Sequence, residues 1–227
     1  MVDLTNVAYT DEYIKRKNMT IDLAYNSSNK LSEKEVINGN LKRIITEYAT
    51  REYFCSNNKV YDVENKLVFE YFNVYNHYFF CNRVKYNNGR EYIFYKTALY
   101  GYNVFSIDTK ETFDYYPKHS FNGGETLIGT DIHFNPHNNI CAVGGCYWAG
   151  PSEIFLIEID DPLKPFGKYI NTHLIIDRAY DKYDDVDFVE WQANDIKIKC
   201  YNMETEKNEL ITITEREYTE QMVEIEK

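Results

Sequence analysis

Short apolar runs alternate with polar turns along most of the chain, from about residue 42 to the C-terminus. The segment 195–201 alternates apolar residues with lysines, which is typical of an antiparallel strand with one face in water. The segment 140–145 contains only small or apolar residues, which favours a strand covered on both faces. Turn residues such as Asn87-Asn88-Gly89 separate the runs. The pattern therefore predicts a fold made of strands.

The predicted strands fall into four sets of four. Four of the runs end in an acid at a polar turn, at residues 62, 108, 160 and 215, which are 46, 52 and 55 positions apart. A repeat of this length suits one four-stranded unit, so the sequence predicts an all-β, propeller-like antiparallel meander of about four four-stranded blades. A β-sandwich is the alternative. The predicted strands are 43–48, 51–56, 59–63 and 67–72; 77–86, 91–97, 102–108 and 112–116; 127–134, 140–147, 153–160 and 166–170; and 187–191, 195–201, 209–214 and 222–225.

Residues 1–41 are more polar and form an expected N-terminal arm or cap on a single domain, residues 42–227. The segment 20–24 is predicted to be a strand that closes the fold by pairing with 209–214. Ser32 and Glu35 have the spacing of a capping box, which predicts a short helix beginning there.

The segment 134–145 carries a resemblance to a known family. Its sequence, Phe-Asn-Pro-His-Asn-Asn-Ile-Cys-Ala-Val-Gly-Gly, resembles the blade signature of WD40-like β-propellers, in which a strand ends at an Asn/Ser-Pro turn and leads into a strand of small residues. The following segment, 154–160, is similar to the third strand of such a blade. The resemblance implies a propeller that presents a rigid rim and loops for binding.

Composition and charge narrow the classes of partner. The chain of 227 residues contains 22 tyrosines, and aromatic side chains favour strands. Its net charge is -11, of which -8 lies in residues 177–227 (-4 in 177–190, +1 in 191–203 and -5 in 204–227). This charge disfavours nucleic-acid binding and would attract a basic protein.

The cysteines and the N-terminal sequence predict a cytoplasmic protein. The five cysteines are odd in number and form no Cys-x-x-Cys pair, so they are interpreted as reduced core thiols. No signal peptide and no apolar run of membrane-spanning length is found in the sequence. No cofactor or metal site is assigned.

The segment 125–148 holds the candidate chemistry. Asp131 and His133 are two residues apart on a predicted strand, so they share a face, and Glu125 is near in sequence. Two carboxylates and an imidazole could bind a divalent metal or carry out acid–base catalysis. Cys141 and Cys146 are further nucleophile candidates, although Cys141 lies in an apolar run where a thiolate is costly. Hydrogen-bonded residues at strand ends are the structural alternative.

Aromatic and polar residues in and around the same segment suggest a binding surface. Exposed aromatic residues at a strand end can form a binding hot spot, or they can pack between blades. The candidate binding residues are Tyr147, Trp148, His137, Trp191 and Glu190.

Three functions follow from the sequence. The first is non-catalytic binding or scaffolding of a protein or peptide through loops and rim, and on this interpretation the chain is not an enzyme. The second is a metal-dependent or hydrolase-type enzyme with its site near Asp131 and His133. The third is an acidic protein that neutralises a basic partner.

Overall fold

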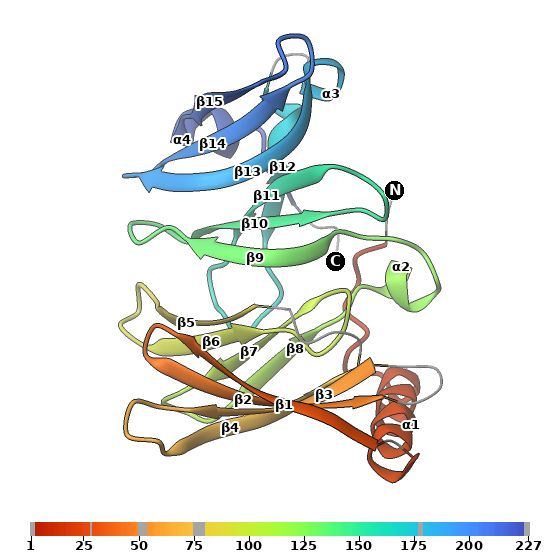
Figure 1. Cartoon of the computed structure of the whole chain (residues 1–227). Coiled ribbons are helices and arrows are strands. Elements are labelled where there is room, and N and C mark those ends of the chain that lie inside the picture. Colours follow the sequence, from red (N-terminus) through yellow and green to blue (C-terminus); the bar gives the residue numbers. More distant parts are fainter. Residues whose placement is uncertain (1–2, 28, 50–53, 75–79, 177–178, 225–227) are drawn as a thin grey trace. The chain divides into compact units, whose positions relative to one another are not determined.

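A computed structural model describes residues 3–27, 29–49, 54–74, 80–176 and 179–224. Antiparallel strands in four sheets make up most of the described chain (Figure 1). The first sheet contains β1 (Asn29–Asn38), β2 (Leu41–Ala49), β3 (Phe54–Tyr61) and β4 (Leu67–Asn73). The second contains β5 (Cys81–Lys85), β6 (Glu91–Tyr95), β7 (Tyr102–Ser106) and β8 (Thr112–Tyr115).

The remaining strands form a third and a fourth sheet. The third contains β9 (Ile128–Phe134), β10 (Ile140–Cys146), β11 (Ser152–Glu158), β12 (Lys168–Asn171) and, next to β12, β16 (Val223–Glu224). The fourth contains β13 (Tyr183–Gln192), β14 (Asp195–Asn202) and β15 (Lys207–Ile213). Except at β16, neighbouring strands in a sheet are consecutive in sequence, as the hairpin turns predicted.

The alternation predicted for β14 is confirmed. Ile196, Ile198 and Cys200 are fully buried, and Lys197 and Lys199 lie on the other face. The two lysines pair with acids of β13, at 3.3 Å for Lys197 and 2.9 Å for Lys199. One face of the strand thus packs into the core while the other carries solvated ion pairs, which add little to stability.

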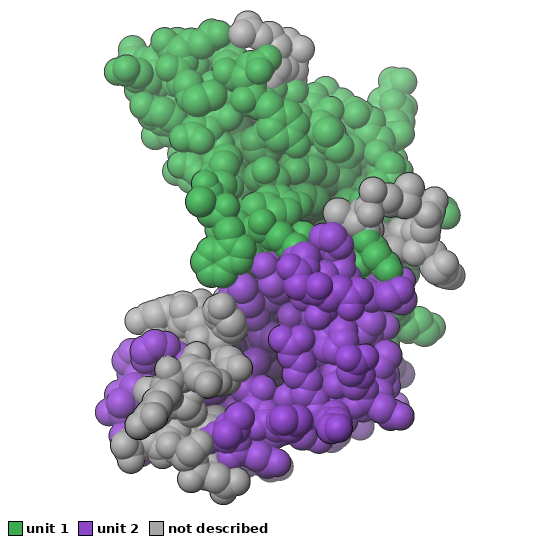
Figure 2. All heavy atoms as spheres, turned by 90° about the vertical axis from the view of Figure 1, so that its right-hand side faces the viewer, with its two compact units in different colours: residues 1–4, 86–89, 125–227 green, residues 5–85, 90–124 purple. Residues whose placement is uncertain are grey.

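Two compact units divide the described chain (Figure 2). One unit comprises residues 1–4, 86–89 and 125–227, and its core joins the third and fourth sheets through side chains such as Ala142, Leu156 and Ile198. The other comprises residues 5–85 and 90–124, and its core joins the first and second sheets. In this second core the ring of Phe69 stacks on that of Phe105, with centroids 4.6 Å apart. A fully buried side chain of this core, such as Ile93, contributes about 1.5–3 kcal/mol.

The predicted strand at 20–24 is wrong, because these residues lie in helix α1 (Asp11–Ser27). The Thr10 hydroxyl oxygen accepts a hydrogen bond from the Tyr13 N–H (3.3 Å), as an N-cap residue does, and two acids occupy the first turn. The buried Tyr13 ring then packs against Tyr116 and Phe121. The predicted closing pair with 209–214 does not form, and β15 pairs with β14 instead.

The predicted helix at Ser32 is also wrong, because Ser32 and Glu35 lie in β1. β1 pairs with β2 along its length, and the Ser32 hydroxyl donates to the Glu47 carboxylate on β2. The backbone of this segment therefore pairs with β2, and the capping pattern does not start a helix.

Two strand predictions differ in extent and placement. The predicted strands 51–56 and 59–63 are one strand, β3, with 51–53 outside the described residues. The predicted last strand of the fourth set pairs with β12 in the third sheet as β16. Helix α4 (Glu215–Thr219) follows β15 and separates the two, and the capping box of Thr214 and Glu217 starts it. The fourth sheet therefore has three strands among the described residues.

Four short helical elements complete the description: α2 (Lys118–Phe121), the 3-10 turn η1 (Thr172–Leu174), α3 (Ala179–Lys182) and α4. None of the described helices is both long and apolar enough to cross a membrane.

Candidate functional site

The pairing of β9 with β10 brings the two main candidate residues together. In the register of this pair Asp131 lies opposite Gly144, and His133 lies opposite Ala142. Residues paired in this way point to the same face of the sheet, here the face that packs on the fourth sheet through Ala142 and Leu156. Because Gly144 and Ala142 are small, they leave room for the polar side chains of β9.

Asp131 and His133 form a hydrogen-bonded pair, called here the dyad. His133 Nε2 lies 2.7 Å from Asp131 Oδ2, and the side chains are 36% and 48% exposed, respectively. The hydrogen bond from His133 lowers the pKa of Asp131, against the opposing effect of burial, and Thr130 adds a hydrogen bond of 3.3 Å. The site is thus ordered by its own contacts and still open to water.

The charge of Asp131 determines which nitrogen of His133 carries the proton. An ionised carboxylate only accepts hydrogen bonds, so Nε2 must be the N–H donor. A neutral His133 ring then has its lone pair on Nδ1. No hydrogen bond is found from any described residue to Nδ1, which makes this nitrogen the one that can take a proton from a ligand or a water molecule.

The fourth sheet holds the His133 ring in place. The ring stacks on Phe188 of β13, with centroids 4.0 Å apart and an interplanar angle of 10°. Trp191 packs on Phe188 (5.9 Å) and donates its indole N–H to the carbonyl oxygen of His133 (3.1 Å). Trp191, predicted as a binding residue, therefore helps to position His133 of the dyad.

Glu125 has a different contact from the one expected. Its carboxylate accepts the backbone N–H of Trp148, so it fixes the loop after β10, and it is not hydrogen-bonded to the dyad. The Trp148 side chain is 59% exposed. Tyr147 is half-buried, and burial, followed by the nearby Glu153 carboxylate, raises its pKa.

The other candidate residues lie apart from the dyad's hydrogen bonds. His137 is exposed, and its backbone N–H donates to Asn135 (2.8 Å) in the turn after β9. Glu190 is exposed and pairs with Lys197. Cys146 is a half-buried free thiol at the end of β10.

Cys141 is buried and unsuited to be a nucleophile. Its side chain is fully buried, and desolvation raises the pKa of its thiol well above the ordinary value. Since only the thiolate is a strong nucleophile, this cysteine is a packed core residue.

A second polar cluster, on the opposite face of the third sheet, was not predicted from the sequence. Glu153 of β11 is 8% exposed, and its carboxylate accepts a 2.6 Å hydrogen bond from Asn171 Nδ2. Asn171 Oδ1 accepts the backbone N–H of His173 (3.0 Å). A signal was present in the sequence: Glu153 is a single acid at the start of the otherwise apolar run 154–157.

The ring of His173, in the same cluster, stacks on that of Tyr180, with ring centroids 4.9 Å apart. The residue is 4% exposed, and its Nδ1 has no hydrogen-bond partner among the described residues. Burial lowers the pKa of His173, and the carboxylate of Glu153 partly opposes this effect. Burial therefore favours the neutral form of the ring.

The described residues contain no group of three or more histidine, cysteine, aspartate or glutamate side chains placed to hold a metal ion. The chemistry that the dyad can perform with its own groups is proton transfer.

The chain resembles several solved structures, with low sequence identity and low TM-scores. No protein-family profile and no curated protein sequence matches the chain. A bifunctional GH43-CE protein of Bacteroides eggerthii is 9% identical, with a TM-score of 0.37, over 82% of this chain and 24% of that one. The catalytic domain of the Coprinopsis cinerea GH62 alpha-L-arabinofuranosidase is 8% identical, with a TM-score of 0.36, over 92% of this chain and 68% of that one.

A third solved structure, a GH62 hydrolase in complex with xylotriose, is 10% identical, with a TM-score of 0.35, over 98% of this chain and 73% of that one. The chain spans about a quarter of the length of the GH43-CE protein. TM-scores below 0.5 do not transfer a fold or an activity to this chain.

None of these likenesses supports the predicted role as a non-catalytic binding or scaffold protein, and the two GH62 structures are described as an arabinofuranosidase and a hydrolase. That role is not retained. A relation to WD40 proteins is not shown by any of the three likenesses.

Proposed function

We propose that the chain is a hydrolase-type enzyme in which His133 acts as general base and Asp131 positions it. The observation that carries the proposal is the 2.7 Å hydrogen bond between His133 Nε2 and Asp131 Oδ2 in a pair that remains open to water. A catalytic base needs a lone pair that is not already used in a hydrogen bond, and Nδ1 carries this lone pair when the His133 ring is neutral.

The proposed reaction is attack by water on an electrophilic centre. His133 Nδ1 takes a proton from the water as its oxygen bonds to the substrate. The imidazolium then returns this proton to the leaving group as the scissile bond breaks, so that no charge is left over. The Asp131 carboxylate stabilises the imidazolium, and its lowered pKa keeps it ionised for this role.

The test is a panel of 4-nitrophenyl esters, phosphates and glycosides, assayed with the full chain. We expect turnover of one class, and a loss of about 10²–10⁴-fold on His133→Gln, which is the usual contribution of a general base. Asp131→Asn should reduce the rate less, because it leaves the imidazole in place.

Asp161→Asn serves as the matched control, since it neutralises a carboxylate in the turn before β12 that pairs with Lys164 (3.1 Å). This variant should keep the wild-type rate. Turnover of no class, or full activity in His133→Gln, would refute the proposal.

We also infer that the four sheets are blades of a propeller-like fold. The support is their topology: apart from β16, each is a meander of consecutive antiparallel strands, which is typical of propeller blades. A crystal structure with the sheets arranged around a common axis would bear this out, and a two-layered sandwich would contradict it.

A further inference from the structure

A buried carboxylate lies on the face of the third sheet opposite to the dyad. Glu153 of β11 is 8% exposed, and it forms no ion pair with any described residue. Its Oε2 accepts the 2.6 Å hydrogen bond from Asn171, whereas its Oε1 accepts none from the described residues and is not sealed from solvent. A buried carboxylate without a counter-ion is costly, because it has lost most of its water. The position therefore favours a positively charged ligand.

The neighbouring His173 has unused hydrogen-bonding capacity. Asn171 joins the two residues, since its Oδ1 accepts the backbone N–H of His173 (3.0 Å). His173 is 4% exposed, and its Nδ1 has no hydrogen-bond partner among the described residues. A buried polar atom without a hydrogen bond destabilises the protein, so a ligand that supplies this bond gains affinity.

Two tyrosine rings lie beside the carboxylate. The Tyr180 ring stacks on His173, with centroids 4.9 Å apart, and the residue is 61% exposed. Burial, and after it the Glu153 carboxylate, raises the pKa of both Tyr147 and Tyr180, so both side chains are within reach of this charge. The face of a tyrosine ring attracts a cation. Because an exposed side chain changes rotamer quickly, Tyr180 can turn aside to admit a ligand.

The hydrogen bond from Asn171 determines which kind of cation fits. A guanidinium binds a carboxylate best through two parallel hydrogen bonds, one to each oxygen. Oε2 of Glu153 is already used by Asn171, which leaves Oε1 for the ligand. An ammonium group is a compact point charge that needs one such oxygen, and its hydrocarbon stem can lie along an aromatic ring.

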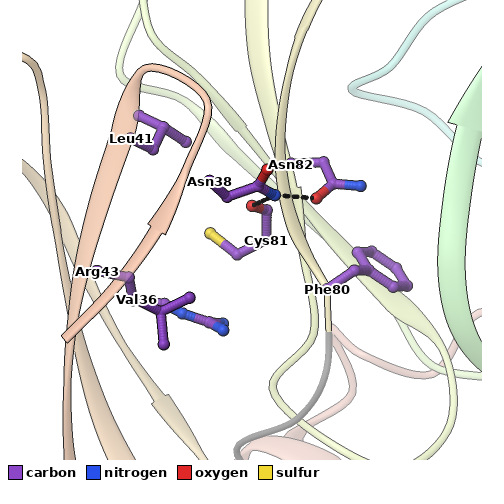
Figure 3. Close-up of a pocket in the computed structure, with 7 residues that line it drawn as sticks. All are labelled: Val36, Asn38, Leu41, Arg43, Phe80, Cys81 and Asn82. Atoms are coloured by element: carbon purple, nitrogen blue, oxygen red, sulfur yellow. Dashed lines mark hydrogen bonds between the residues drawn. The ribbon is translucent and has the colours of Figure 1, made fainter. Parts of the chain in front are cut away.

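A pocket in the other unit lacks such a carboxylate. It lies between the β1–β2 hairpin and the start of β5 and has a volume of about 100 Å³ (Figure 3). Asn38 Nδ2 donates to Asn82 Oδ1 there, at 2.8 Å. None of the described residues that line it is an acid, so it offers no counter-charge to an ammonium group.

We propose that the cluster of Glu153, His173, Tyr147 and Tyr180 binds the ammonium group of a primary alkylamine, either a free amine or a lysine side chain. The ammonium donates one N–H to Glu153 Oε1 and another to Nδ1 of the neutral His173 ring, and the alkyl stem lies on Tyr180. The net charge of -11 draws cations toward the protein. The proposal does not rest on the hydrolase function, since Glu153 pairs with Gly145 and Asp131 with Gly144, on opposite faces of the sheet.

The test is NMR titration of the full ¹⁵N-labelled protein with n-butylammonium chloride, at constant ionic strength. We expect saturable shifts at the side-chain amide of Asn171 and the backbone amides of Glu153 and His173. Binding should be at least about tenfold weaker for n-butanol, which has no charge, and for tetramethylammonium, which has no N–H donor. Unsaturated shifts spread over the acidic segment 204–224, or equal binding of tetramethylammonium, would overturn the proposal.

Nα-acetyl-lysine N-methylamide distinguishes the two sources of the ammonium group. Tighter binding of this compound than of n-butylammonium would assign the site to a lysine side chain of a peptide, and weaker binding would assign it to a free amine. Saturable binding of neither compound would refute the site.

Glu153→Gln removes the charge at nearly constant shape and should reduce n-butylammonium affinity at least about tenfold. Glu158→Gln makes the same change at the other end of β11, where the carboxylate pairs with Lys168 (3.5 Å), and should leave affinity unchanged. His133→Gln should also bind as the wild type does, which separates this site from the dyad.

Tyr180→Leu changes an exposed position and should weaken binding about two- to fivefold, the worth of an exposed cation–π contact. Wild-type affinity in Glu153→Gln, with a dispersed NMR spectrum, would sink the assignment. If Glu153→Gln does not fold, wild-type affinity in Tyr180→Leu would have the same consequence.

Discussion

The carboxylate of Asp131 on β9 lies over Gly144 on β10, in the space that a Cβ atom at position 144 would occupy. A Cβ built there would collide with Oδ1 of Asp131. Gly144 opposes Asp131 in the strand register, so the close approach is set by the pairing of two strands. The position of the Asp131 carboxylate in the dyad therefore depends on the absence of a side chain at Gly144.

Replacing Gly144 by alanine should displace the Asp131 carboxylate and lengthen its hydrogen bond to His133. The clash is with the end of a half-exposed side chain, so the cost should lie at or below the low end of the about 1–3 kcal/mol typical of core overpacking, measurable by urea unfolding. Hydrolytic activity should fall together with stability. Gly150→Ala is the control, because a Cβ at Gly150 would meet its nearest neighbour at an ordinary 3.5 Å. Equal stability of the two variants would contradict the packing argument.

The dyad should contribute to stability in a pH-dependent manner. The pKa of Asp131 in the folded chain is below its ordinary 3.8, mainly through the hydrogen bond from His133. The contribution is fully present above pH 3.8 and is lost as the pH falls through the lower folded value. Since the Asp131 side chain is 48% exposed, solvent screening limits it to at most about 1 kcal/mol.

Urea unfolding at pH 7, 5 and 3 measures this contribution. Asp131→Asn should be less stable than wild type at pH 7 and 5, and the difference should shrink toward pH 3. A difference that is the same at all three pH values would show that the carboxylate charge is not involved.

His173 should make the fold sensitive to mild acid. Burial places its folded pKa below the ordinary 6.5, so the unfolded chain takes up the proton first as the pH falls. Its contribution to stability is present above pH 6.5 and is lost as the pH falls through the depressed folded value. The free energy of unfolding should therefore decrease between about pH 7 and pH 5.

His173→Gln should flatten this pH dependence and reduce stability at pH 7 by about 1–3 kcal/mol, because the buried ring is lost. His137→Gln changes an exposed histidine and should leave the slope as it is in the wild type. A wild-type slope in His173→Gln would assign the effect to another group.

Asn171 should be a stability residue of the third sheet. Its side chain donates to the buried Glu153 carboxylate (2.6 Å) and accepts from the His173 backbone (3.0 Å). Asn171→Ala leaves a buried carboxylate without this donor, which should cost about 2–4 kcal/mol in thermal or urea unfolding. Asn171→Asp should cost more, because it places two carboxylates in contact. A loss below 0.5 kcal/mol for both variants would mean that Glu153 is solvated in another way.

Much of the strand content could be predicted from local pattern. β14 shows why: Ile196 and Ile198 alternate with lysines, and the side-chain period of a strand alone sets which residues are buried. Asp131 and His133 were predicted to share a face for the same reason, and the structure confirms this with a hydrogen bond. Glu125 was expected nearby on sequence distance, which says nothing about the direction in which a loop turns.

The errors arose where distant contacts decide between local alternatives. Ser32 and Glu35 have the spacing of a capping box, but the ladder with β2 makes them part of a strand. Tyr13 is buried against rings more than 100 positions away in sequence, and this packing favours α1 over a strand.

The sequence by itself determined most of the strand content, the antiparallel pairing of neighbours and the faces that carry charge, because side-chain alternation and turn chemistry act over a few residues. Only the tertiary structure decided that Gly144 makes room for Asp131, that Phe188 stacks on His133 and that β16 joins β12. These contacts link segments that are far apart in sequence. They depend on how whole sheets pack, and no local propensity encodes that.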